Sequence, residues 1–217
     1  MTETAAAFVP DTASLPELAA AAADCQGCEL FEHATQTVFG QGFKRSRAIL
    51  VGEQPGDVED RRGVPFVGPA GRVLDRALTD AGIERRDVYL TNAVKHFRWT
   101  PAPRGKRRIH QTPEARHVTA CRPWLSAELS AIRPDVVVAL GAVAAKALFG
   151  SAFRLTQHRG EPLEWPPEHG AYAGDDTAVK AAFATVHPSS ILRADPDDRD
   201  DAYAQLVHDL QVVARSM

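Results

Sequence analysis

The sequence predicts an α/β fold with three layers, α/β/α, around a central, mainly parallel sheet of four strands. Four short apolar runs have the length of buried strands, and they lie at residues 48–51, 88–91, 136–140 and 182–186. Segments with the period of an amphipathic helix separate these runs, and this alternation is typical of a parallel sheet covered on both faces. With 217 residues, 44% of them hydrophobic, the chain has the size of one domain, and we predict a single domain over residues 1–217.

The elements of the first half are expected to form a β-α-β unit. Residues 1–14 are expected to be a loose arm, and the alanine-rich residues 15–23 a helix. After the first strand, apolar side chains recur on one helical face over residues 70–81, and Gly82 ends this helix. The strand at residues 88–91 completes the unit.

Proline and glycine interrupt the pattern in the second half. Residues 95–112 are expected to lack regular structure because Pro101, Pro103 and Gly105 fall among them. Helices are expected at residues 113–132, 142–149 and 198–215. A short strand or hairpin is expected within residues 154–167, and a polar loop at residues 171–176.

A glycine-rich loop at residues 52–71 is the first candidate ligand site. Its glycines, Gly52 and Gly56 among them, allow close approach of the backbone to a ligand. The loop has neither the Gly-Lys-Ser/Thr ending of a phosphate-binding P-loop nor the Gly-x-Gly-x-x-Gly of a dinucleotide site. Phe66 stands between turn residues and outside any apolar period, which indicates a stacking platform rather than a core residue.

Polar side chains follow three of the predicted strands. Glu53 and Gln54 follow the first strand, Asn92 the second and His187 the fourth. Because the carboxyl ends of parallel strands meet at one edge, these side chains are expected to converge on a ligand site. The alternative is that each caps the next helix, a reasonable role for Asn92 or Ser189 alone. An asparagine amide carries a donor beside an acceptor, which favours a nucleic-acid base as the ligand.

A net charge of −3 gives no global reason to expect nucleic acid, so any polyanion site must be local. The local candidates are Arg104, Lys106, Arg107 and Arg108. A run of charge is usually a solvated face, but the position of this run between prolines, beside the expected site, favours contact with phosphates.

The compartment is expected to be the cytoplasm. Three cysteines cannot all pair with one another, which favours a reducing environment. The amino-terminal residues lack the basic region of a signal peptide, and no run of about 18 apolar residues suggests a membrane span.

The spacing Cys25-x-x-Cys28 leaves three alternatives open: a redox pair, half of a metal site, or chance. No thioredoxin-like βαβ pattern follows these cysteines. Cys121, in the helix after the basic loop, is a candidate third ligand of a metal site.

Four short motifs occur in a fixed order along the chain. They are Gly-Glu-Gln-Pro-Gly at 52–56, Pro-Phe-Val-Gly-x-Ala-Gly at 65–71, Thr-Asn-Ala-Val-Lys at 91–95 and His-Pro-Ser-Ser at 187–190. Together they resemble the iron–sulfur uracil-DNA glycosylases, from about Cys25 to the carboxyl terminus. Within that family, Gln54 in place of the commoner glycine and the inserted Lys-Arg-Arg-Ile-His at 106–110 resemble the UdgX branch, which joins itself covalently to uracil-containing DNA.

The resemblance implies a role for each residue at the expected site. Phe66 would stack on a flipped uracil, and His187 would donate to its O2, where charge grows as the glycosidic bond breaks. Asn92 would pair with O4 and N3–H and so reject cytosine, whose donor and acceptor are reversed there. The resemblance also implies that Gly52, Gln54 and Gly56 contact the uracil base. Ser189, Ser190 and the basic loop would contact the DNA strand.

The resemblance also puts His110 in the place of the water that attacks C1′ in an ordinary glycosylase. Glu53 would stabilise the oxocarbenium-like sugar and accept the N–H of the second ring nitrogen. The residues alone favour a solvated histidine in a basic loop. Two alternatives therefore stay open: a multiple-turnover glycosylase that uses water, and a uracil-DNA binding module without chemistry.

In the related enzymes the fourth cluster ligand is a cysteine just after the Asn-x-x-Lys motif, and His96 stands there in this chain. His33 is a second candidate. Three cysteines and a histidine suit zinc as well as iron–sulfur. The resemblance selects a [4Fe–4S] cluster on Cys25, Cys28, His96 and Cys121, and it implies a monomer that prefers uracil in single-stranded DNA.

Overall fold

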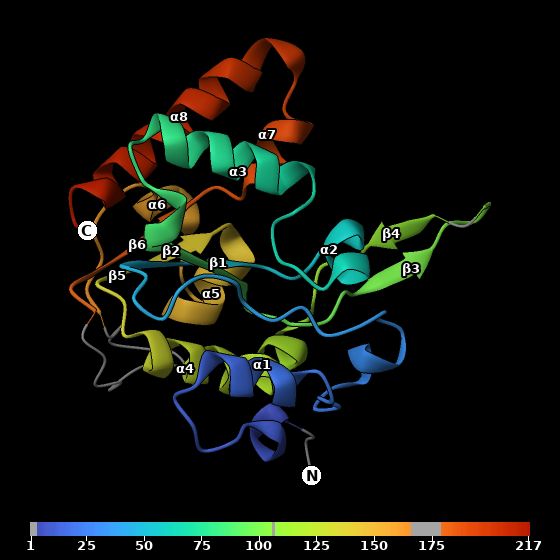
Figure 1. Ribbon diagram of the computed structural model, residues 1–217. Coiled ribbons are helices and arrows are strands. Elements are labelled where there is room, and N and C mark those ends of the chain that lie inside the picture. The colour runs from blue at the N-terminus through green and yellow to red at the C-terminus, as the bar shows by residue number, and fades with distance from the viewer. Residues whose placement is uncertain (1–3, 106, 166–178) are drawn as a thin grey trace.

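The central layer is a four-stranded sheet in which every neighbouring pair of strands is parallel. The computed structural model describes residues 4–105, 107–165 and 179–217. The strands stand in the order β2-β1-β5-β6 (Figure 1), with bounds β1 (Ala48–Gly52), β2 (Val88–Asn92), β5 (Val136–Leu140) and β6 (Ala181–Thr185). The expected three-layer fold with a parallel four-stranded sheet is confirmed.

Helices cover both faces of the sheet because its strands are apolar on both faces. Along β1, Ala48 and Leu50 pack against one helical layer, while Ile49 and Val51 pack against the other. Figure 1 shows α3, α7 and α8 on one side of the sheet and α1, α4 and α5 on the other. Their bounds are α1 (Leu15–Ala22), α3 (Pro69–Asp80), α4 (Ala115–Ile132), α5 (Ala142–Phe149), α7 (Pro188–Arg193) and α8 (Arg199–Ala214). The helices expected from periodicity are found with ends shifted by at most two residues.

Residues 95–112, expected to lack regular structure, instead contain an antiparallel hairpin that projects from the body of the molecule (Figure 1). Its strands are β3 (Trp99–Pro101) and β4 (Arg108–His110). The expectation is wrong for two reasons. Pro101 stands at the last position of a short edge strand, where its missing N–H costs no hydrogen bond between the strands. Gly105 adopts a φ of 86° in the turn between the strands, which glycine allows. Trp99 lies opposite His110, so His110 stands at the base of the hairpin.

The glycine-rich loop contains a short helix, α2 (Asp57–Arg62), that the sequence analysis did not predict. Gly63 ends it in the left-handed conformation, with a φ of 70°. Its six residues are almost all charged, so no apolar period marks them as a helix.

The amino-terminal segment is more ordered than expected. A turn of 3-10 helix, η1 (Ala5–Phe8), buries Ala5 so closely against Gly27 that a side chain on Gly27 would come within 2.5 Å of the Ala5 nitrogen. The expectation of a loose arm over residues 1–14 is therefore wrong for this turn.

Before β6 the chain forms α6 (Leu155–His158) rather than the expected strand or hairpin. Isolated bridges pair Arg159 with Ala184 and Leu163 with Ala182. Residues 166–167 and the polar loop expected at 171–176 lie outside the described residues. The remaining 3-10 turns are η2 (Glu29–Glu32), η3 (Arg85–Asp87) and η4 (Pro196–Asp198). Within the described part of the chain, every helix is too short or too polar to cross a membrane.

Candidate functional site

The carboxyl ends of β1, β2 and β6 bring several predicted residues to one edge of the sheet. Gly52, the last residue of β1, lies beside Asn92, the last residue of β2. A side chain on Gly52 would collide with Asn92 Oδ1 and come within 2.7 Å of the Phe66 ring. Phe66 in turn stacks on His187, with the ring centroids 6.1 Å apart and the planes at 28°. Glycine is therefore needed at position 52 for these groups to meet.

The loop after β1 holds Phe66 in an unusual backbone conformation. Phe66 has a φ of 56°, a left-handed value that is rare for a bulky residue. Gly71 makes room for this turn, because a side chain there would collide with the Phe66 carbonyl. Glu59 of α2 accepts a hydrogen bond from the Gly68 nitrogen at 2.7 Å and also packs against Gly56. These contacts hold the loop in one conformation at the edge of the site.

His187 is held in one tautomer. Its Nδ1 accepts a hydrogen bond from the Ser189 nitrogen at 3.1 Å, so the proton of the neutral ring must be on Nε2. Burial, with the positive charge of Arg193 and a smaller effect of the nearby His110, lowers the pKa of His187 to about 4, which keeps the ring neutral. The hydroxyl of Ser189 also contacts Nδ1, and that of Ser190 donates to the His187 carbonyl. Both serines, expected to contact DNA, thus support His187.

Glu53 is a partly buried residue whose carboxyl group has one buried oxygen without a hydrogen-bond partner. Its Oε1 accepts no hydrogen bond from the residues that the structure describes. Burial raises the pKa of Glu53 to about 7, while the positive charge of Arg193 opposes this shift. Glu53 Oε1 lies 3.6 Å from Nε2 of His110, the residue at the base of the hairpin. Arg193 was not among the predicted site residues; its place one helical turn after Ser189 in α7 is the signal that could have found it.

The side chain of Gln54 holds the two ends of the hairpin together. Its Oε1 accepts from the Arg98 nitrogen at 3.0 Å, and its Nε2 donates to the carbonyls of Arg98 and Gln111 at 3.2 and 2.9 Å. His110 Nε2 also lies 2.9 Å from Gln54 Nε2. The two amide hydrogens are shared among these acceptors, so only the backbone of Gln54 remains for the uracil contact that the resemblance implied.

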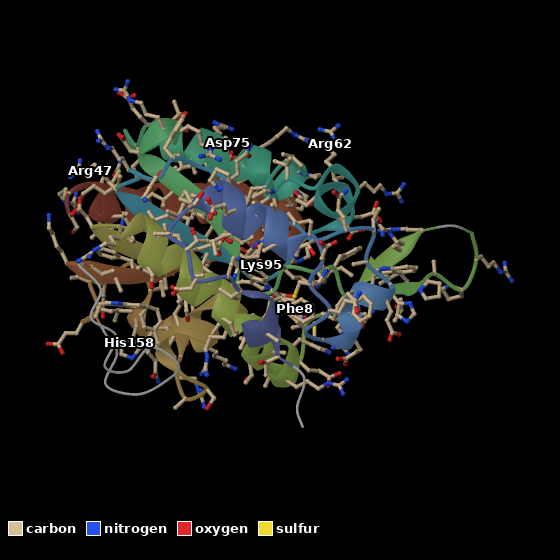
Figure 2. The ribbon with its side chains drawn as sticks, turned by 60° about the horizontal axis from the view of Figure 1, so that its bottom comes forward. Phe8, Arg47, Arg62, Asp75, Lys95 and His158 are labelled. Atoms are coloured by element: carbon tan, nitrogen blue, oxygen red, sulfur yellow. The ribbon has the colours of Figure 1, made fainter. Side chains whose placement is uncertain are left out.

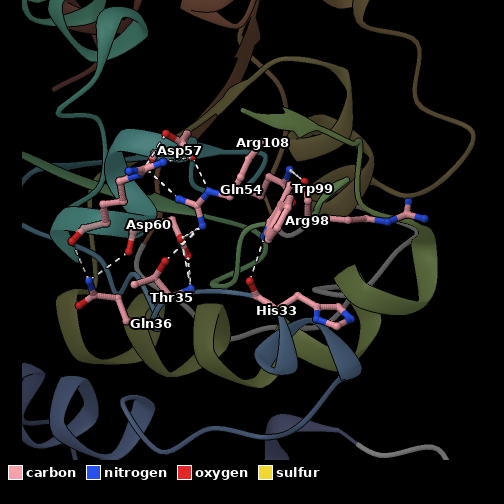
Figure 3. Close-up of polar contacts among 10 residues, drawn as sticks. His33, Thr35, Gln36, Gln54, Asp57, Asp60, Arg98, Trp99 and Arg108 are labelled. Atoms are coloured by element: carbon pink, nitrogen blue, oxygen red, sulfur yellow. Dashed lines mark hydrogen bonds and ion pairs between the residues drawn. The ribbon is translucent and has the colours of Figure 1, made fainter. Parts of the chain in front are cut away.

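Arg108 joins the hairpin to helix α2 and is therefore not available for phosphate contact (Figure 3). Its guanidinium pairs with Asp57 and, at 2.6 Å, with the fully buried Asp60. The Thr35 hydroxyl accepts a third hydrogen bond, and the Trp99 ring lies against the same group. This assignment corrects the expectation that Arg108 contacts DNA.

Two other basic residues, Arg104 and Arg107, lie in the segment that joins the strands of the hairpin. Arg104 and Arg107 are exposed to solvent, as a phosphate contact requires. Lys106 lies outside the described residues.

A comparison with known protein families places the chain in one of them. The family model described as "Uracil DNA glycosylase superfamily" matches residues 39–211, which span β1 to β6 and every residue at the sheet edge described above. The chain belongs to the uracil-DNA glycosylase superfamily. The expected family is therefore confirmed at this level.

Relatives within the superfamily cover most of the chain. A type-4 uracil-DNA glycosylase of Thermotoga maritima is 38% identical over 170 residues, 78% of this chain and 78% of the relative. A type-4 uracil-DNA glycosylase of Sulfurisphaera tokodaii is 33% identical over 184 residues, 82% of this chain and 76% of the relative. A type-5 uracil-DNA glycosylase of Pyrobaculum aerophilum is 45% identical over 115 residues, 52% of this chain and 41% of the relative.

The three cysteines of this superfamily member lie in one buried cluster. Cys25, Cys28 and Cys121 are free thiols, and burial raises the pKa of Cys121 to about 12, with the other two thiols adding to the shift. The backbone nitrogen of Lys95 donates to Cys121 Sγ, and Trp124 Nε1 donates to Cys25 Sγ, each at 3.2 Å. Hydrogen bonds to sulfur are the kind of support that the cysteine ligands of an iron–sulfur cluster receive.

His96, the expected fourth ligand, does not form a metal site with the three cysteines in this structure. His96 is buried, and its Nε2 lies 2.8 Å from the Thr37 hydroxyl. Burial lowers the pKa of His96 to about 4, so the ring is neutral, as a metal ligand must be. His33, the other candidate, is exposed. Across residues 4–105, 107–165 and 179–217, no group of three or more His, Cys, Asp or Glu side chains has the geometry to hold a metal ion.

A buried ion pair behind Asn92 is a feature that the sequence analysis missed. Lys95 Nζ lies 2.5 Å from Glu128 Oε2, and both side chains are almost fully buried. Lys95 also donates to the Asn92 carbonyl at 2.9 Å, and Glu128 accepts from the Tyr89 and Thr91 hydroxyls at 3.0 Å. Figure 2 shows Lys95 in the interior of the molecule. The pair fixes the end of β2, from which Asn92 projects.

Proposed function

We propose that this protein excises uracil from DNA, with a preference for single strands, and then joins the deoxyribose C1′ to His110. The observation that carries the proposal is the position of His110 Nε2, 3.6 Å from the buried Glu53 Oε1. Glu53 directly follows Gly52, against which Asn92 and Phe66 lie, and Phe66 stacks on His187. The names of the type-4 relatives support the excision step. We also propose that the chain belongs to the UdgX branch and acts as a monomer.

Recognition of the base rests on Phe66 and Asn92. The Phe66 ring stacks on the extruded uracil, and the Asn92 amide donates to O4 and accepts from N3–H. Cytosine presents the opposite pattern, so a buried amide would be left unpaired against it. The backbone between Gly52 and Gln54 supplies the remaining contacts to the base.

Cleavage of the C1′–N1 bond sends the bonding electron pair into uracil, and negative charge grows on O2. The neutral His187 ring donates its Nε2–H to this oxygen, and the Ser189 nitrogen fixes the tautomer that makes this donation possible. Ionised Glu53 stabilises the positive charge that remains on the sugar.

Capture follows when an unprotonated nitrogen of His110 attacks C1′. The new N–C1′ bond forms from the lone pair of that nitrogen, and the ring becomes an imidazolium. Its remaining N–H proton passes to Glu53 or to solvent, which leaves a neutral, alkylated imidazole without a ready leaving group. Burial lowers the pKa of His110, which keeps a lone pair available near neutral pH.

We also propose that Cys25, Cys28 and Cys121, with Nδ1 of His96, hold a [4Fe–4S] cluster, with zinc as the alternative metal. Nδ1 is the nitrogen in question because Nε2 of His96 contacts Thr37. The cluster would supply structural support. The thiols would hold the cluster beside Lys95, whose backbone nitrogen donates to Cys121 Sγ.

A denaturing gel separates this function from its alternatives. The protein is incubated with a uracil-containing single strand and with the same strand carrying thymine. A heat-stable, slow-moving band that needs uracil supports capture. Free DNA with an alkali-labile abasic site indicates turnover by water, and unchanged DNA indicates binding only. The variant His110→Ala should lose the band, whereas His208→Ala, which removes an exposed histidine of α8, should keep it.

A further inference from the structure

We propose that a pocket between α4 and α5 binds a nucleotide that directly adjoins the uracil in single-stranded DNA. This inference rests on the proposed function and names a further part of its substrate. The pocket has a volume of about 490 Å³, within the usual range for small-molecule sites. Its lining includes Ala93, Val118, Arg122, Val143, Lys146 and Ala147.

The pocket adjoins the candidate active site through two segments of the chain. Ala93 lines the pocket and directly follows Asn92, the proposed reader of uracil. Thr112 lines it as well, two residues after His110. A group bound there is therefore a close neighbour of the nucleotide under attack, so the adjoining nucleotide is the occupant that this position favours.

The lining matches a base attached to a phosphate. Aliphatic side chains from both helices, Val118 and Val143, offer an apolar surface for the face of a base. One cation stands on each helix, Arg122 on α4 and Lys146 on α5. Neither cation forms an ion pair with another residue in the described part of the chain, so both are available to a phosphate.

Double-stranded DNA holds its bases in pairs, whereas a single strand can turn a flanking base into such a pocket at low cost. The pocket thus gives a physical reason for a preference for single strands. It also predicts that the preference depends on one neighbour of the uracil and not on distant nucleotides.

The test uses single strands with one uracil and one 2-aminopurine, a base that brightens when it leaves its stack. The 2-aminopurine is placed next to the uracil on the 5′ side, next to it on the 3′ side, or three nucleotides away. We expect brightening of at least twofold on binding at one adjacent position, and none at the distant position. Ala147→Phe, which fills the pocket, should abolish this response while still forming the covalent adduct at saturating DNA.

A charge-reversal pair provides the second measurement. Arg122→Glu with Lys146→Glu should weaken binding of a short uracil strand about tenfold more than Lys44→Glu with Arg45→Glu, a difference of about 1.4 kcal/mol. The control pair has the same change in net charge and lies in the exposed turn before β1, at the amino ends of the strands. It therefore corrects for the general loss of attraction to DNA.

The outcomes separate this inference from the proposed function. If adducts form normally but no adjacent base brightens, or if the two charge-reversal pairs weaken binding equally, the pocket does not hold a nucleotide and only this inference is wrong. If the protein binds uracil DNA and the adjacent base brightens without any adduct, the pocket stands and capture is wrong. If no uracil strand binds, both proposals are overturned.

Discussion

Replacing Arg108 by alanine should release the hairpin that carries His110. The Asp60 carboxylate, one partner of the Arg108 guanidinium, is fully buried. Removing one partner of a buried ion pair costs about 3–5 kcal/mol, because the other charge is left uncompensated. Asp60 keeps the hydrogen bonds of the Thr35 nitrogen, at 3.0 and 3.1 Å, so we expect the lower end, about 3 kcal/mol. The second pair, with Asp57, adds less than about 1 kcal/mol because Asp57 is more than a third exposed.

Two assays measure the effect of Arg108→Ala. Urea unfolding gives the loss of stability, and the rate of adduct formation, measured where the variant is still folded, gives the loss of positioning. Arg107→Ala is the matched control, since it removes the neighbouring, exposed arginine and should change stability by less than about 0.5 kcal/mol. Arg108→Lys keeps the charge but loses the planar fork, so it should fall between the two. A wild-type free energy of unfolding together with a wild-type adduct rate in Arg108→Ala would refute the role of this residue.

Three further substitutions test other parts of the site. Burial raises the pKa of Glu53 from its ordinary 4.5 to about 7. The charged carboxylate therefore destabilises the fold above pH 7, and it is absent below pH 4.5. Because Glu53→Gln removes this charge, the variant should raise the free energy of unfolding by up to about 3 kcal/mol, at high pH only. Urea titrations on either side of this window check it, and an equal effect at both pH values would contradict it. The adduct rate of the wild type should also rise through pH 7 as Glu53 ionises, whereas Glu53→Gln should lack this rise. Asn92→Asp puts an acceptor opposite uracil O4 and should slow single-turnover excision about 5- to 160-fold, from about 1–3 kcal/mol for an unpaired buried group. An unchanged rate would remove Asn92 from base recognition. Cys121→Ser should abolish the brown colour and the bound iron of the purified protein, and full retention of iron would contradict the ligand set.

The sheet and its main helices could be predicted from the sequence because burial leaves a regular pattern. The strand at Val136–Leu140 and the helix at Ala142–Phe149 end where the sequence placed them, since one is wholly apolar and the other is bounded by glycines. The hairpin left no such pattern. Its strands have three residues each and lie outside the core, and side chains from elsewhere hold them in place.

The candidate site shows the same division. Residues at strand ends, such as Asn92 and His187, could be expected at one edge from topology alone. The role of Arg108 could not, because its partners Asp57 and Asp60 lie about 50 residues earlier in the chain. Local charge does not reveal which of several adjacent basic residues is paired and which are free for DNA. Gln54 is similar: nothing in the local sequence reveals that its amide donates to the backbone of the hairpin, more than 40 residues later in the chain.

Mass spectrometry of the protein–DNA adduct tests the central claim most directly. Trypsin cuts after Arg108 and Arg116, so His110 falls in the short peptide of residues 109–116. After nuclease and trypsin digestion of the adduct, this peptide should carry the mass of the deoxyribose remnant, with fragmentation placing it on His110. A remnant on the peptide of residues 181–193, which holds His187, or the absence of any covalent product with uracil DNA, would contradict capture by His110.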